Sequence, residues 1–203
     1  MRADFCAGAV LISFGGLIGK TSATQMLFIC LCEVIFYNIN ENIGLKLMIS
    51  DVGGSYVIHM FGAYFGLACS WYLSPKSAGQ RSDNAAVYHS DLFAMIGTVF
   101  LWMFWPSFNA GPQTGMAAHR AVINTLLSLS GSCVAAFFAS KILRSDKKFN
   151  MVDIQNATLA GGTFAHFVFE HVKVCLKICF KSNITNITFT KLRQIPCPTE
   201  YQP

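Results

Sequence analysis

The sequence predicts an all-α fold, a polytopic transmembrane helix bundle with about five complete spans and a broken sixth. Of its 203 residues, 53% are hydrophobic and only 12% are charged, roughly half the charged share of a soluble domain. The charges lie between long apolar runs, whereas a soluble amphipathic helix would carry them along one face. This is the composition of a membrane protein.

The first two spans are predicted at residues 3–18 and 24–47. Arg2 and the apolar run after it resemble a signal peptide. However, Lys20 follows the run and no convincing cleavage site is present, so we expect an uncleaved span. Glu33 interrupts the second span, and a charged group at membrane depth must face protein or water. A hydrogen bond from Glu33 to a neighbouring helix is the simpler expectation.

The third span is expected to begin at Asp51 and to end near Leu73, which is long enough to cross a bilayer as a helix. The remaining elements are a polar loop at 75–88, spans at 91–108 and 121–143, a basic loop at 144–150 and a closely packed helix at 151–162. Ser90 is expected to cap the fourth span, and Pro106 is expected to loosen its last turn.

Lysines and arginines fall mostly in loops, and their bias sets the orientation of a membrane protein. The side with more of them, which should be cytoplasmic, carries Lys20, Lys76, Arg81, Lys141, Arg144, Lys147 and Lys148. Asp51 and Phe108 then lie near the outer mouth. The net charge of +5 is explained by this topology, so no nucleic-acid partner is predicted.

Cysteines and histidines give no sign of a disulfide framework or a metal site. Five of the eight cysteines lie inside apolar runs and are expected to be buried thiols. They are Cys6, Cys30, Cys32, Cys69 and Cys133. The pattern His166-x-x-x-Glu170-His171 is one residue too long for a zinc motif. No metal or cofactor is predicted, and no nucleophile–base pair indicates an enzyme.

A single histidine, His59, lies near the middle of the uncharged run that follows Asp51. An ionisable side chain at membrane depth is costly and marks a functional candidate. One stripe at helical spacing contains Ser55, His59, Gly62 and Gly66. The glycines remove bulk from it, so His59 is expected to face other helices. Two interpretations stay open: a pore histidine that relays a proton, and a structural histidine bonded to a neighbouring helix.

The string Asp-x-Gly-Gly-Ser-x-x-Ile-His-x-Phe-Gly-Ala-Tyr-Phe-Gly-Leu at residues 51–67 resembles the pore helix of the Rh glycoproteins, the animal branch of the ammonium transporter family. Ala-Asp-Phe-Cys-Ala-Gly-Ala-Val-Leu-Ile-Ser-Phe-Gly at residues 3–15 and Trp-Pro-Ser-Phe-Asn at 105–109 also match. Residues 1–162 are therefore expected to form the middle part of an Rh membrane domain, lacking both ends. Residues 163–203 form a divergent tail.

The resemblance implies a bundle of helices around a narrow pore, assembled as a trimer. By this resemblance His59 is one of two paired pore histidines, Phe108 is the outer gate and Asp51 is the acidic residue of the vestibule. The implied function is transmembrane transport of ammonium or ammonia, with histidine-assisted deprotonation in a hydrophobic pore. The choice between ammonia, methylamine and carbon dioxide is open. The implied surroundings are a lipid bilayer, homo- or heterotrimeric Rh subunits, and a plasma membrane, basolateral in epithelia.

A second function is also consistent with the sequence, a non-transporting fragment that associates with full-length Rh subunits or is degraded. Half of a pore would expose the polar face of His59 to lipid, which a bilayer penalises. The tail contains Asn183-Ile-Thr and Asn186-Ile-Thr, which match glycosylation acceptors that only a lumenal tail could use.

Overall fold

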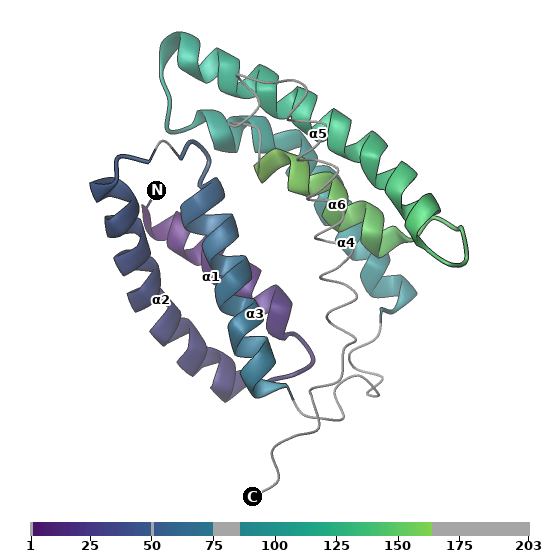
Figure 1. Cartoon of the computed structure of the whole chain (residues 1–203), viewed down its shortest axis with the longest axis horizontal. Helices are drawn as coiled ribbons and strands as arrows, with labels where there is room; N and C mark the ends of the chain where they lie inside the picture. The colour runs from purple at the N-terminus through teal and green to yellow at the C-terminus, as the bar shows by residue number, and fades with distance from the viewer. Residues whose placement is uncertain (1, 50, 75–85, 164–203) are drawn as a thin grey trace, which may run out of the picture. The chain divides into compact units, whose positions relative to one another are not determined.

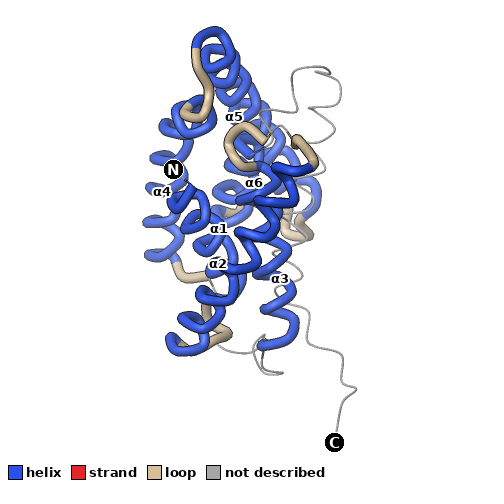
Figure 2. Tube along the Cα trace, turned by 90° about the vertical axis from the view of Figure 1, so that its left-hand side faces the viewer, coloured by secondary structure: helices blue, strands red, loops and turns tan. Residues whose placement is uncertain are grey.

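The computed structural model describes residues 2–49, 51–74 and 86–163, and every regular element in these ranges is a helix (Figure 2), which confirms the all-α fold. The helices are α1 (Arg2–Leu17), α2 (Ala23–Lys46), the π-helix η1 (Ser55–Met60), α3 (Phe61–Leu73), α4 (Tyr88–Ala110), α5 (Gly115–Leu143) and α6 (Met151–Thr163) (Figure 1). They form two compact units, with α1, α2, η1 and α3 in unit 1 and the other three helices in unit 2.

Three helices among the described residues, α2, α4 and α5, are long and apolar enough to cross a membrane. The first helix, α1, has 16 residues and is shorter than the roughly 20 that a span needs, as expected for residues 3–18. η1 and α3 run without a break from Ser55 to Leu73. The lengths and composition of these helices therefore agree with the polytopic membrane fold that the sequence predicts.

Unit 1 is built around α1, which packs against α2, η1 and α3. Its contact with α3 is close, because a Cβ atom on Gly62 would lie 2.7 Å from the carbonyl oxygen of Ala9. A Cβ atom on Gly66 would lie 2.7 Å from the Cα atom of Ser13. The two glycines thus bring the backbones of α1 and α3 together, as small residues do in membrane helix pairs.

The third span does not begin at Asp51 as predicted. Residues 51–54 form a turn, and the helix begins at Ser55. The reason is the backbone of Gly53 and Gly54, whose φ angles of 84° and 74° lie in the left-handed region. Helical residues have negative φ, so the two glycines prevent an earlier start.

The predicted stripe on this span needs a related correction. The residues of η1 and α3 that are buried inside unit 1 are Ile58, Gly62, Gly66 and Ser70. His59, which follows Ile58, keeps part of its surface exposed, but its Nε2 atom is buried. The two glycines of the stripe are buried as predicted and Ile58 joins them, whereas Ser55 and His59 are only partly buried.

In unit 2, α4 and α5 both begin earlier than predicted. α4 begins at Tyr88 with Val87 as its N-cap, so Ser90 lies in the first turn and does not cap the helix. Asp91 also lies in this turn, where the helix dipole favours a negative charge. α5 begins at Gly115 and not at residue 121, because Met-Ala-Ala follows, a sequence with high helix propensity.

Small residues let α6 pack closely on α5, as expected from its sequence. A Cβ atom on Gly161 would lie 2.4 Å from the Cβ atom of Ser132. The hydroxyl of Ser132 donates to the carbonyl oxygen of Ala157, and that of Ser128 donates to the carbonyl oxygen of Gly161 at 2.6 Å. These two hydroxyls therefore bond α5 to the backbone of α6, and the buried carboxylate of Asp153 on α6 accepts from Ser140 on α5 at 3.2 Å.

The five cysteines of the apolar runs are free thiols. Only Cys6 is buried within the described residues, and the other four are partly exposed, so the expectation of burial holds for one of them. The tail from residue 164 and most of the loop at 75–88 lie outside the described residues. The glycosylation acceptors and the pattern around His166 therefore also lie outside them.

Candidate functional site

Asp51 holds the start of the helix that carries His59. Its carboxylate accepts hydrogen bonds from the backbone N–H of Tyr56, at 3.0 Å, and of Val57, at 2.9 Å. These N–H groups belong to the first turn, where a helix has no internal acceptors for them. A carboxylate at this position also interacts favourably with the helix dipole. Asp51 therefore caps and orients η1, eight residues before His59.

His59 lies in the wide turn of a π-helix. Its backbone N–H donates to the carbonyl oxygen of Gly54, five residues earlier, at 3.1 Å, and the N–H of Ile58 donates to the same oxygen at 2.9 Å. Such turns are rare and occur frequently at functional sites. Gly54 is required here, because a Cβ atom on it would lie 2.2 Å from the Cδ1 atom of Ile58.

Behind η1 and α3, unit 1 contains a buried carboxyl group. Glu33 of α2 is fully buried, and its Oε1 atom shares a hydrogen bond with the hydroxyl of Ser13 on α1. This confirms the expected bond to a neighbouring helix. The same hydroxyl lies 2.9 Å from the carbonyl oxygen of Gly62 on α3. Three helices therefore meet at Ser13, close to the turn that contains His59.

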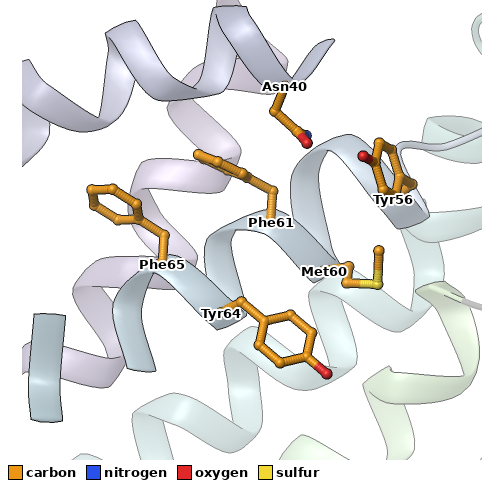
Figure 3. A pocket seen from close by; sticks show the side chains of 6 residues that line it. All are labelled: Asn40, Tyr56, Met60, Phe61, Tyr64 and Phe65. Carbon is orange, nitrogen blue, oxygen red and sulfur yellow. The ribbon is translucent and has the colours of Figure 1, made fainter. Parts of the chain in front are cut away.

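A pocket of about 440 Å³ opens beside the same helix (Figure 3). Its lining consists of Asn40 from α2, Tyr56 and Met60 from η1, and Phe61, Tyr64 and Phe65 from α3 (Figure 3). The rings of Phe61 and Phe65 are stacked with their centroids 5.7 Å apart. The walls are mainly aromatic, and His59 is not among the lining residues.

Phe108 lies near the end of α4 in unit 2, and 41% of its surface is exposed. Its ring stands edge-on to Trp105, with centroids 6.4 Å apart. Trp105 is itself buried, and a Cβ atom on Gly162 would lie 2.7 Å from its indole ring. Trp105 is therefore a packing residue that supports Phe108.

Sequence reasoning missed Asn109, the neighbour of Phe108. Its amide is 4% exposed and donates to Thr125 on α5 and to the carbonyl oxygen of Gly162 on α6, both at 3.0 Å. The available signal was an amide inside an apolar helix, because such groups commonly bond across membrane helices. Asn109 therefore links α4, α5 and α6 at the turn that carries Phe108.

The predicted site residues fall in both units. Asp51 and His59 share one helix start in unit 1, and Phe108 belongs to unit 2. Within residues 2–49, 51–74 and 86–163, no group of three His, Cys, Asp or Glu side chains could hold a metal ion. The local chemistry thus consists of a capped histidine helix, a buried carboxyl group and an anchored aromatic pair.

A model of the Ammonium Transporter Family matches residues 1–165. The Rh type B ammonium transporters of Mus musculus and Homo sapiens are 51% and 52% identical to this chain over 165 residues, which is 80% of this chain and 36% of theirs. In a solved structure, Rh50 of Nitrosomonas europaea matches with a TM-score of 0.79 and 29% identity, over 97% of this chain and 56% of that one.

The matched region contains Asp51, His59 and Phe108 together with the helices that position them. The chain spans just over a third of the length of these curated relatives, 36%. The family match extends over four fifths of this chain, and the fold agrees with that of an Rh structure. The chain therefore belongs to the ammonium transporter family, in its Rh branch.

Proposed function

We propose that the protein takes part in transmembrane transport of ammonium or ammonia, with His59 as the proton relay. The observation that carries this proposal is the start of η1, where Asp51 caps the helix and Gly54 accepts the N–H of His59 in a π-turn. A π-turn around an ionisable residue is frequent at functional sites.

The chemistry follows from the cost of moving a charge through hydrocarbon. Ammonium must lose its proton before the neutral molecule crosses cheaply, and an imidazole can accept that proton because it titrates near neutrality. Apolar walls exclude hydrated metal ions, which cannot replace their water shells there. In this proposal His59 receives the proton and returns it, while the apolar walls select for ammonia.

Phe108 is proposed as the outer gate and Asp51 as the anion of the vestibule. The exposed ring of Phe108, supported by Trp105, can hold an incoming cation by cation–π attraction. The carboxylate of Asp51 combines a negative charge with its bonds to Tyr56 and Val57. It can therefore attract a cation and fix the histidine helix at the same time.

The test is methylammonium uptake by cells that express the chain, its His59→Ala variant, or a full-length Rh relative. His119→Ala is the matched control, because His119 is an exposed histidine near the start of α5. We expect His59→Ala to lower uptake at least about tenfold, since positioned proton transfer contributes about 10²–10⁴-fold. Equal uptake by the parent and His59→Ala chains would reject the relay.

A second candidate function is that of a non-transporting subunit fragment. In this case the chain would join full-length Rh subunits in a trimer at the plasma membrane, the basolateral one in epithelia. Co-purification with a tagged full-length relative, combined with background uptake by the chain alone, would support the fragment and exclude independent transport.

A further inference from the structure

Glu33 is a buried acidic group that the proposed transport chemistry does not use. Its side chain has no exposed surface and makes no ion pair among the described residues. Its titratable neighbours are the thiols of Cys6, Cys30 and Cys69. The charged residues of α1 are Arg2 and Asp4 at its start, and Lys20 follows its end at Leu17. A buried carboxylate without a cation is strongly disfavoured.

The first argument for the protonation state of Glu33 is that the Ser13 hydroxyl has one hydrogen but faces two acceptor oxygens. The Ser13 hydroxyl lies within hydrogen-bond distance of Glu33 Oε1 and of the carbonyl oxygen of Gly62. A hydroxyl has one hydrogen to donate, and a carboxylate and a carbonyl oxygen both only accept. If Glu33 were ionised, one of these two contacts would bring lone pairs together without a proton.

The second carboxyl oxygen gives an independent argument. Glu33 Oε2 is buried and has no hydrogen-bond partner among the described residues. A carboxylate oxygen without a donor bears half of an uncompensated charge, whereas the carbonyl oxygen of a neutral acid is much less costly to leave unpaired. Both observations are satisfied if Oε1 carries a hydrogen and Oε2 is the carbonyl oxygen.

We propose that Glu33 is a neutral carboxylic acid that donates its hydrogen to Ser13, whose own hydrogen goes to the carbonyl oxygen of Gly62. The resulting series of hydrogen bonds runs from Glu33 on α2 through Ser13 on α1 to Gly62 on α3. It ends about one helical turn beyond His59. Glu33 is thus a positioning residue for the histidine helix. Its protonation state stands on this geometry alone, whereas its effect on transport rests on the proposed function.

The local sequence is suited to this arrangement. Ser13 reaches the backbone of α3 because Gly62 and Gly66 have no side chains, and a Cβ atom on either would lie 2.7 Å from α1 backbone atoms. Ser13 is itself 1% exposed, so water does not compete for its hydroxyl. The close contact at Gly62 and Gly66 and the buried Glu33 therefore act together to hold α3 against α1 and α2.

The first test is infrared spectroscopy of the full chain in lipid nanodiscs near neutral pH, with isotope-labelled glutamate. We expect a C=O stretching band of a protonated carboxyl group that shifts with the label and disappears in Glu33→Gln. Glu41→Gln is the matched control, because Glu41 lies on the same helix and pairs with Arg2 at 3.6 Å; it should keep the band. Absence of the band in the parent chain, or its persistence in Glu33→Gln, would overturn the proposal.

The second test compares substitutions by thermal unfolding and by uptake at equal surface expression. Glutamine keeps the length of glutamate and can donate a hydrogen to Ser13, so Glu33→Gln should retain the parent melting temperature. Glu33→Asp is too short to reach Ser13, and Ser13→Ala removes the link, so both should lower the melting temperature. A Glu33→Gln variant as unstable as Glu33→Asp would contradict a neutral acid.

The two proposals fail separately. If His59→Ala does not affect uptake while the band and the stability of Glu33→Gln are as expected, only the transport proposal is rejected. If transport depends on His59 but the folded Ser13→Ala variant retains full uptake, the proposal that the Glu33–Ser13–Gly62 hydrogen bonds position His59 is rejected.

Discussion

The two units bring their helices together through glycines but use different polar groups at the contacts. In unit 1, Gly62 lies against the backbone of α1, and the polar partner is the carboxyl group of Glu33. In unit 2, Gly161 lies against α5, and the polar partners are the hydroxyls of Ser128 and Ser132. Both units also bury an acid, but Glu33 of unit 1 makes no ion pair among the described residues, whereas Asp153 of unit 2 accepts from Ser140 and pairs with Arg144, both at 3.2 Å.

The units also differ in their backbones. The helices of unit 2 are regular α-helices, and α4 continues to Ala110 through Pro106. Unit 1 contains the π-turn of η1 and two left-handed glycines directly before it. Irregular backbone is expensive in a membrane unless it is fully hydrogen-bonded. In unit 1 this irregular backbone directly precedes and includes the turn that carries His59.

The largest effect is expected at the α1–α3 contact. Gly62→Ala places a Cβ atom 2.7 Å from the carbonyl oxygen of Ala9, a backbone atom that cannot move alone. We expect the free energy of unfolding to fall by about 3 kcal/mol, at the upper end for overpacking. Thermal unfolding of the purified chain in detergent measures this. Uptake should fall with it if the contact positions His59.

Gly15→Ala is the matched control, because nothing lies within 4 Å of a Cβ atom at that position in α1. Alanine favours a helix over glycine by about 0.5–1 kcal/mol, so this variant should be slightly more stable than the parent chain. In unit 2, Gly161→Ala and Gly131→Ala form the corresponding pair. Equal stability within either pair would mean that the close contact is not formed in the membrane.

The next largest effect is expected at the left-handed glycine before η1. Gly54→Ala adds the strain of a left-handed residue, about 1–2 kcal/mol, and a Cβ atom only 2.2 Å from Ile58. The expected result is a lower melting temperature together with a loss of uptake that depends on His59. Both are measured on the same purified or expressed variants.

Gly115→Ala separates the two causes. Gly115 also has a positive φ, 60°, but nothing lies within 4 Å of its Cβ position. This variant should show the backbone strain without the steric contact, so Gly54→Ala should be the more destabilising of the two. If both variants lose the same stability, packing of Ile58 against Gly54 contributes nothing and the π-turn is held by its hydrogen bonds alone.

Much of the fold could be predicted because helix spans depend on local composition. The six helical segments were predicted at nearly their observed positions, and the bond from Glu33 to a neighbouring helix followed from the cost of a charge at membrane depth. The starts of α4 and α5 were wrong because α4 extends into the polar residues Tyr-His-Ser and α5 into Met-Ala-Ala, which favours a helix. The length of an apolar run does not report where such a first turn begins.

The details of the site were less predictable because they depend on backbone angles and partners distant in sequence. Gly53 and Gly54 were read as part of a helix, but their positive φ angles move its start to Ser55. Asn109 was quoted only as part of a matching string, although its amide joins three helices. The roles of His59, Phe108 and Asp51 remain predictions.

The smallest effect is expected at Asn109, and it tests the hydrogen bonds by which its amide joins α4 to α5 and α6. Asn109→Ala removes the amide that donates to Thr125 and to the carbonyl oxygen of Gly162. Polar bonds between membrane helices contribute on average about 0.6 kcal/mol and at most about 1.7, so two bonds should contribute about 1 kcal/mol. Asn156→Ala is the control, because the exposed Asn156 amide bonds only within α6, to Val152. A loss at Asn109 as large as that at Gly62 would mean that unit 2 depends on polar bonds as strongly as unit 1 depends on close packing.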